Sequence, residues 1–270
     1  MAQPVLLRLS PAEWMLCVMV VQPDADAALA QSVNRTMSPE RLQGSLQTAR
    51  DVLLARDLAH LMPNGKLDIN PVVRLCARAV LTPRASFGLT VIEPDGSSSV
   101  TFYNWLPGFT IGTWVDENQI RSFELLDSSD LIGLQVLTRY LGNEPMAGGE
   151  SAEVRSFTVQ AATLPTLPVD KPEKVNGLAT ALARGGLSGD DATALEHAFA
   201  SPTRRAVLAA ASSINPRTRT LLWLMADGKV WLIAQDTGAA TVSVSSANMA
   251  GLNMTLNTYV HDVLATVNNT

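Results

Sequence analysis

Residues 86–92 read Ser86-Phe87-Gly88-Leu89-Thr90-Val91-Ile92, and they open the stretch that decides the fold. Apolar and polar residues alternate here with the two-residue period of a β-strand. Three more segments with strand character follow, at residues 99–105, 109–115 and 120–125. The turns between the four segments are Pro94-Asp95-Gly96, Pro107-Gly108 and Asp116-Glu117-Asn118. This stretch is therefore predicted to form an antiparallel meander of four strands.

The same plan recurs about 120 residues further along the chain. Thr82-Pro83-Arg84 falls on Ser201-Pro202-Thr203-Arg204, and Tyr140 falls on Tyr259. The second set of strand segments covers residues 205–212, 218–225, 229–233 and 240–245. A four-stranded sheet alone leaves its edge strands unpaired. Two copies joined about a pseudo-twofold axis pair two of these edges and so form a more stable sheet. The predicted fold is α+β with an internal repeat, in which a central antiparallel sheet is flanked by two helical groups.

The repeat gives the predicted domain organisation. Residues 1–145 form the first repeat, residues 146–172 a linker and residues 173–270 the second repeat, all within one compact unit. The linker is assigned because residues 142–174 contain several Pro and Gly residues and show little periodicity. Val154, Phe157 and Val159 alternate in a way that permits one short strand there.

Helix starts are marked by a small polar residue followed by proline, which is the signature of an N-cap and a first helical position. It occurs at Ser10-Pro11, Ser38-Pro39 and Asn70-Pro71, and it predicts helices over residues 11–21, 39–54 and 71–81. Glu13 stands three residues after Ser10, which is the spacing of a capping box. Further helices are predicted after Asp130, through Tyr140, and over residues 173–183, 188–200 and 249–264.

Composition and charge exclude several classes of protein. Hydrophobic residues make up 47% and charged residues 17% of the 270, which argues against a disordered chain. The net charge is -5 without any basic run, so we expect no nucleic-acid partner, although the Asn64-Gly65 turn also occurs in winged-helix DNA readers. No apolar run is long enough for a membrane span, and the first residues lack the features of a secretory signal. We therefore expect no membrane insertion and a cytoplasmic location.

The sequence offers little catalytic chemistry. Gly-rich phosphate loops and nucleophile elbows are absent, and His60, His197 and His261 have no ligand-type residue at metal-binding spacing. Carboxylate pairs such as Asp190 with Asp191 stand at helix starts, where capping explains them. The prediction is that the chain is not an enzyme and holds no metal or cofactor. The alternative is a small-molecule-binding or hydrolytic enzyme with a site between the repeats, for which the candidates are Arg84, Arg121 and Asp130.

Apolar side chains are then the remaining candidates for function. Cys17 and Cys76 stand in apolar stretches, where a thiol usually serves as a small core residue. The strand tryptophans are core residues or, on an open face, anchors for a partner; they are Trp105, Trp114, Trp223 and Trp231. A second set of residues would form either an apolar groove on the second helical group or part of its core, and comprises Phe199, Leu252, Met254 and Leu256.

Three stretches carry a resemblance to a known family: Ala55-Arg56-Asp57-Leu58, Asn64-Gly65-Lys66-Leu67-Asp68-Ile69-Asn70-Pro71 and Ala198-Phe199-Ala200-Ser201-Pro202. With them the layout resembles the EspG family, the cytosolic chaperones of type VII (ESX) secretion that bind PE-PPE substrate pairs. The resemblance covers about residues 5–264. It implies a quasi-twofold fold without catalysis and a helical PPE protein as partner.

The resemblance also implies where the partner would bind. The family binds the tip of its PPE partner through a strand loop of the first half and through the second helical group. In this chain the helical group corresponds to residues 173–200 and 249–264. The loop, which is shorter here than is usual in the family, comprises Glu93, Pro94, Asp95, Gly96, Ser97 and Ser98. The expected function is a cytosolic chaperone or adaptor for a helical secretion substrate.

Overall fold

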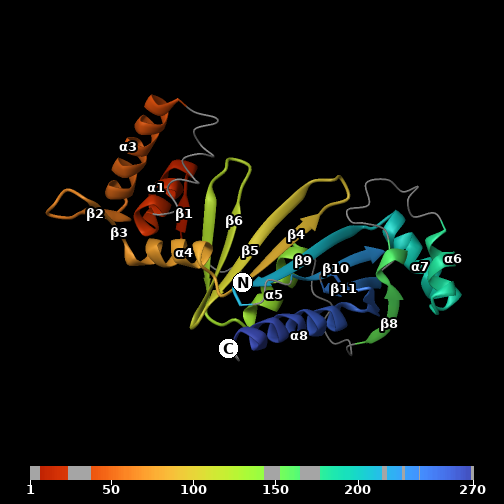
Figure 1. Cartoon of the computed structure of the whole chain (residues 1–270). Helices are drawn as coiled ribbons and strands as arrows, with labels where there is room; N and C mark the ends of the chain where they lie inside the picture. The colour runs from red at the N-terminus through yellow and green to blue at the C-terminus, as the bar shows by residue number, and fades with distance from the viewer. Residues whose placement is uncertain are drawn as a thin grey trace. The chain divides into compact units, whose positions relative to one another are not determined.

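The computed structural model describes residues 7–23, 38–142, 153–164, 177–214, 218–226, 229–236 and 238–268 (Figure 1). The helices are α1 (Pro11–Val21), α3 (Pro39–Ala55), α4 (Pro71–Leu81), α5 (Leu131–Leu141), α6 (Leu178–Arg184), α7 (Gly189–Ala200) and α8 (Met249–Asn268). The strands of the first half are β1 (Leu7–Leu9), β2 (Ala59–Leu61), β3 (Leu67–Ile69), β4 (Ala85–Ile92), β5 (Ser98–Leu106), β6 (Phe109–Val115) and β7 (Arg121–Leu126). Those of the second half are β8 (Val154–Gln160), β9 (Arg204–Ser212), β10 (Arg219–Ala226), β11 (Lys229–Asp236) and β12 (Thr241–Ala247). The α+β class predicted from sequence is confirmed.

Ten strands form one sheet in the order β1-β7-β6-β5-β4-β9-β10-β11-β12-β8, and β2 pairs with β3 in a separate hairpin. The pairings with a described register are all antiparallel. In the middle of the order, Leu89 of β4 lies opposite Leu208 of β9. These two residues are as far apart in the sequence as Tyr140 and Tyr259. This order is what an internal repeat would produce, and the repeat itself stays a prediction.

The chain divides into two compact units whose limits differ from the predicted repeat boundaries. Unit 1 comprises Met1–Pro83 and Tyr103–Asp127, and unit 2 comprises Arg84–Phe102 and Ser128–Thr270. The predicted boundaries at residues 145 and 173 remain a prediction.

In unit 1 the capping signals act as expected from the sequence. The Glu13 N–H donates to Ser10 Oγ at 3.3 Å, and the Ser10 N–H donates to the Glu13 carboxylate at 2.7 Å, which completes the capping box of α1. Arg56 donates to the other oxygen of that buried carboxylate at 2.7 Å. The start of α1 is therefore tied to the end of α3.

The core of unit 1 contains both cysteines. Cys17 of α1 and Cys76 of α4 are buried among apolar side chains from β1, β6 and β7. Burial raises the pKa of each thiol to about 12. Because the thiolate is the reactive form, these thiols are unreactive core residues, as the sequence indicated.

Unit 2 has one sheet face on which the side chains of β4 and β9 are buried. Phe87, Leu89 and Val91 of β4 alternate with half-buried residues and lie on this face together with Leu208 of β9. Helix α8 contacts β4 and β9, and α5 packs against α8. The ring of Tyr140 on α5 meets the Trp223 ring edge-on, with 5.4 Å between ring centroids. Helices α5 and α8 therefore cover this face, which is called the covered face below.

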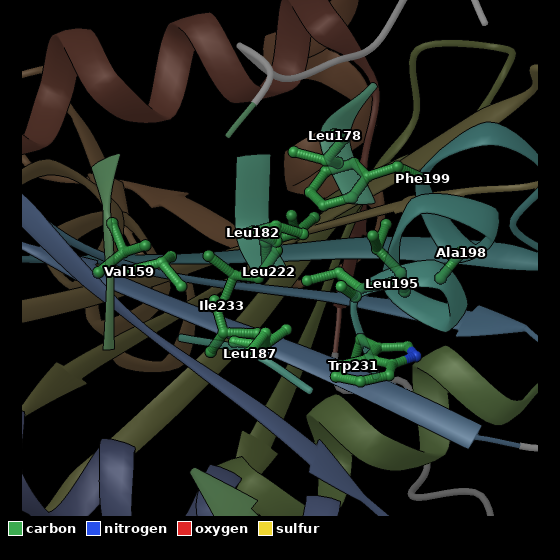
Figure 2. Close-up of a cluster of buried hydrophobic side chains, with 14 of the residues drawn as sticks. Val159, Leu178, Leu182, Leu187, Leu195, Ala198, Phe199, Leu222, Trp231 and Ile233 are labelled. Atoms are coloured by element: carbon green, nitrogen blue, oxygen red, sulfur yellow. The ribbon is translucent and has the colours of Figure 1, made fainter. Parts of the chain in front are cut away.

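The opposite face of unit 2 is covered only in part. Helices α6 and α7 place Leu182, Leu195 and Phe199 against the side chains of Leu222 and Trp231, which project from β10 and β11 (Figure 2). Trp223 and Trp231 are thus both core residues, on opposite faces of the sheet. This helix pair covers the part of the face built by β10, β11 and β12.

Of the two outer strands, one was only permitted by the sequence pattern and the other was not predicted. Strand β8 lies within the segment predicted as a linker, and it pairs with β12 along its whole length. Strand β1 was not predicted, because three residues are too few to show a period. The helix predicted over residues 173–183 is described from Leu178 onward, and residues 146–152, 165–172 and 173–176 lie outside the described residues.

Among the described residues, no helix combines the length and the apolar character needed to cross a membrane.

Candidate functional site

The hairpin between β4 and β5 is short and internally bonded. The Glu93 N–H donates to the Ser97 carbonyl at 2.9 Å, and the Gly96 N–H donates to the Glu93 carbonyl at 3.0 Å. Gly96 has φ 85°, a left-handed conformation that favours glycine. The Ser97 N–H donates to Asp95 Oδ1 at 2.8 Å. Hydrogen bonds from the Ser97 side chain and backbone lower the pKa of Asp95, so its carboxylate is held ionised at the tip.

This hairpin contains the loop expected to contact a partner. Its residues Pro94, Asp95, Gly96, Ser97 and Ser98 are exposed, and Glu93 at its base is half-buried. The structure thus presents the expected loop as a compact, solvent-facing turn.

Arg204 fixes the base of the hairpin. Its Nε–H donates to Glu93 Oε2 at 2.9 Å, and one terminal N–H group donates to the carbonyls of Tyr140 and Leu141 at 2.6 and 3.2 Å. Its guanidinium also lies 5.8 Å from the centroid of the Tyr140 ring. Arg204 therefore joins the hairpin to the C-terminal end of α5, where carbonyl groups lack helical donors.

Beside the hairpin lies a sheet surface that the helices leave open. A Cβ atom on Gly88 would lie 3.1 Å from the Phe102 ring, so this ring of β5 rests on the glycine of β4. Phe102 is 44% exposed, and Val100, two residues earlier on the same side of β5, is 41% exposed. Gly88 pairs with Ala209 of β9. We call this surface the open face, and it comprises Gly88, Thr90, Ile92, Val100, Phe102 and Ala209; the neighbouring Val207 packs against the α6–α7 core.

The open face is apolar at its centre and charged at its hairpin end. Gly88 has no side chain, and this leaves room for the Phe102 ring to lie flat on the sheet as an apolar surface. Arg205 stands opposite Ile92 in the register and is half-buried on the same side of the sheet. Together with the Asp95 carboxylate it provides charge of both signs at the border. An apolar centre with a charged rim is the usual composition of a protein-binding surface.

The residues predicted on the second helical group are mostly core. Phe199 is 2% exposed in the α6–α7 core, and Leu252 and Leu256 of α8 are fully buried. These three side chains cannot reach a partner in this fold, and the core alternative considered from the sequence is the one observed. Met254 is 50% exposed, but it belongs to α8, which packs on the covered face. The structure therefore does not bring Met254 to the open face.

The three residues considered for an enzyme have the following surroundings. Arg121 in unit 1 stacks over the Trp14 ring at 4.9 Å, and burial lowers the pKa of its guanidinium. In unit 2, the exposed Arg84 accepts a hydrogen bond at its backbone carbonyl from Ser213, and Asp130 precedes α5 without a side-chain cap bond. In the described ranges, no group of three or more His, Cys, Asp and Glu side chains could hold a metal ion.

Two open grooves lie along α3 in the described part of unit 1. One has a volume of about 420 Å³ and is lined by Leu16, Leu42, Leu46 and Arg50 among others. The other, of about 700 Å³, lies by Glu13 and small residues of α3 such as Gly44. Arg56 and the backbone of Ser10 already bind the Glu13 carboxylate, so this group is a structural element and not a free ligand.

Solved structures with a similar fold include the type VII secretion system chaperone EspG5 of Mycobacterium tuberculosis in complex with a PE25-PPE41 dimer. The TM-score is 0.55 at 12% sequence identity, over 80% of this chain and 83% of that chain. No protein-family model matches the sequence, and no curated protein matches it. At this identity the likeness establishes the fold alone.

Proposed function

We propose that this chain is a chaperone or adaptor that binds a protein partner through the open face and the β4–β5 hairpin of unit 2. The observation that carries the proposal is the 44% exposure of Phe102 on β5, beside β4 and β9, whose side chains on the opposite face are buried. A large aromatic side chain on an open sheet, beside a second exposed apolar residue, is the kind of anchor that protein interfaces use.

The proposed partner is a helical secretion substrate of the PE-PPE kind, bound before export by a type VII system. Two facts support this choice. The solved chaperone with the similar fold is in complex with a PE25-PPE41 dimer, and the sequence resembles the EspG family in the stretches around Asp57, Asn64 and Phe199. A chaperone of this kind needs neither a cofactor nor catalysis, and it would meet its substrate in the cytoplasm.

The hairpin is suited to this task because it is preformed. The turn closes with its own hydrogen bonds and Arg204 fixes its base, so little backbone ordering would accompany binding. Lower ordering cost leaves more of the contact energy as affinity. The expected binding mode is that of a rigid hairpin and an apolar sheet surface against the end of a helical protein.

Co-expression with PE-PPE pairs tests this function. The panel would include PE25-PPE41 and any such pairs encoded next to the gene for this chain. We expect at least one pair that is insoluble alone to become soluble and to elute with the chain as one complex in size-exclusion chromatography. If every pair stays insoluble, or elutes apart from the chain, the chaperone proposal fails.

A further inference from the structure

Strand β8 forms one outer edge of the ten-stranded sheet. It pairs with β12 from Val154, opposite Ala247, to Gln160, opposite Thr241. Within the part of the chain that the structure describes, no strand pairs with its other side. This edge strand of seven residues therefore carries outward-pointing backbone groups that can bond to another strand.

The direction of those backbone groups follows from two flanking hydrogen bonds. The Ala161 N–H donates to the Ala240 carbonyl at 2.9 Å, and the Asn248 N–H donates to the Glu153 carbonyl at 3.4 Å. Both pairs continue the β8–β12 register, and hydrogen-bonded positions alternate along an antiparallel ladder. The odd-numbered residues of β8 therefore bond to β12. The N–H and C=O groups that point outward belong to Val154, Ser156, Thr158 and Gln160.

Strand β8 lacks the features that usually protect an edge. Native edges are kept short or carry proline, several charges or bulges. Strand β1, at the other end of the order, is three residues long and follows this rule. Strand β8 has no proline, and Arg155 is its single charged residue. Such an edge can take up a further strand.

We propose that β8 pairs antiparallel with β8 of a second copy of this chain, about a twofold axis at Phe157. The sequence of β8 is self-complementary in this register. Outward-facing Ser156 would lie opposite Thr158 of the second copy, and Val154 opposite Gln160, so all the hydrogen-bonding groups face each other. No like charges meet, because Arg155 faces Val159.

Phe157 would form the centre of this contact. It is half-buried against the α6–α7 core, beside the buried Val159. Across the axis the two Phe157 rings would be a directly opposed pair without backbone hydrogen bonds, which is the closest cross-strand position. Aromatic pairs at such positions stabilise strand association.

A lysine introduced on β8 tests whether this strand pairs with a second copy. Thr158→Lys places two ammonium groups diagonally across the proposed axis, and its exposed side chain leaves the β12 ladder unchanged. Ser243→Lys is the matched control, because Ser243 is exposed on the same side of the sheet, directly opposite Thr158 but on β12. In sedimentation equilibrium the wild-type chain is expected to dimerise. Thr158→Lys should weaken the dimer at least about tenfold, and Ser243→Lys should leave it unchanged.

The register is tested by cross-linking. Phe157→Cys puts two thiols on the axis about 4.5 Å apart between Cα atoms, so a mild oxidant such as diamide should join them as a disulfide. Arg155→Cys faces Val159 and should stay uncross-linked. The native thiols Cys17 and Cys76 are buried with their pKa raised to about 12, and they should not react.

Several results would overturn the pairing with a second copy. They are a wild-type chain that stays monomeric at every concentration, a dimer unaffected by Thr158→Lys, and cross-linking at position 155 but not at position 157. A monomeric chain whose complex with a PE-PPE pair is weakened by Thr158→Lys would assign the edge to a partner and also overturn it. The chaperone proposal uses the open face, so its co-expression test is independent of these outcomes.

Discussion

Phe102→Asp is expected to weaken the complex with the PE-PPE partner about a hundredfold, which corresponds to about 2.7 kcal/mol. The ring rests on Gly88 at the centre of the open face and is 44% exposed, so it can be covered by a partner. Aspartate removes this apolar anchor and places an unpaired charge in the interface. Isothermal titration calorimetry with the co-purifying pair measures the effect. Loss of the contact with Gly88 and the poor strand propensity of aspartate should lower the free energy of unfolding by about 1–2 kcal/mol, which leaves the chain folded for the binding measurement.

Leu134→Asp is the matched control for this substitution. Leu134 is 38% exposed, and it lies on α5, on the other side of the sheet. The same change of an exposed apolar residue to aspartate should therefore leave affinity within about twofold of the wild type. Equal losses in the two variants would show that Phe102 has no special place in binding.

Arg204→Ala is expected to lower the free energy of unfolding by about 3 kcal/mol. The alanine variant leaves Glu93 and the carbonyls of Tyr140 and Leu141 without their charged donor, in a place where the Arg204 side chain is only 19% exposed. Urea denaturation followed by circular dichroism measures the loss. The Ser97 amide should also exchange hydrogen faster, because the base of the hairpin is no longer held.

Arg205→Ala provides the control for Arg204→Ala. Arg205 is the next residue of β9, is half-buried, and has no side-chain hydrogen bond or ion pair among the described interactions. Its loss should cost less than about 0.5 kcal/mol. A similar cost for both variants would contradict the anchoring role of Arg204.

The helices and most strands could be predicted from the sequence because their signals are local. Ser10, Ser38 and Asn70 each cap a helix whose first residue is the expected proline. The turn residues Pro94-Asp95-Gly96 likewise predicted the β4–β5 hairpin. Helix caps and turns depend on a few neighbouring residues, so they can be predicted without knowledge of the tertiary structure.

The two outer strands could not be predicted in the same way. Strand β8 is stabilised by β12, which follows it only after α6, α7 and three other strands, and β1 is paired with β7. Val154, Phe157 and Val159 permitted a strand but gave no indication of its partner. Pairing between strands that are far apart in the sequence is set by tertiary packing, which the pattern of a short stretch of sequence does not show.

The residues proposed here for binding agree only in part with those proposed from the sequence, for a related reason. The hairpin is where the sequence placed it, whereas Phe199, Leu252 and Leu256 are buried. Phe87 and Phe102 have the same strand-like surroundings in the sequence, yet one is fully buried and the other is open. The difference lies in which face α5 and α8 cover, and a two-residue period cannot show this.

Hydroxyl-radical footprinting of the free chain and of its complex with a PE-PPE pair tests the proposed binding surface most directly. Phe102 on the open face and Met254 on α8 are both exposed and both readily oxidised, so each reports its own side of the sheet. The account predicts that the complex protects Phe102 about tenfold and leaves Met254 as reactive as in the free chain. If the complex protects Met254 and leaves the oxidation rate of Phe102 unchanged, binding through the open face is contradicted.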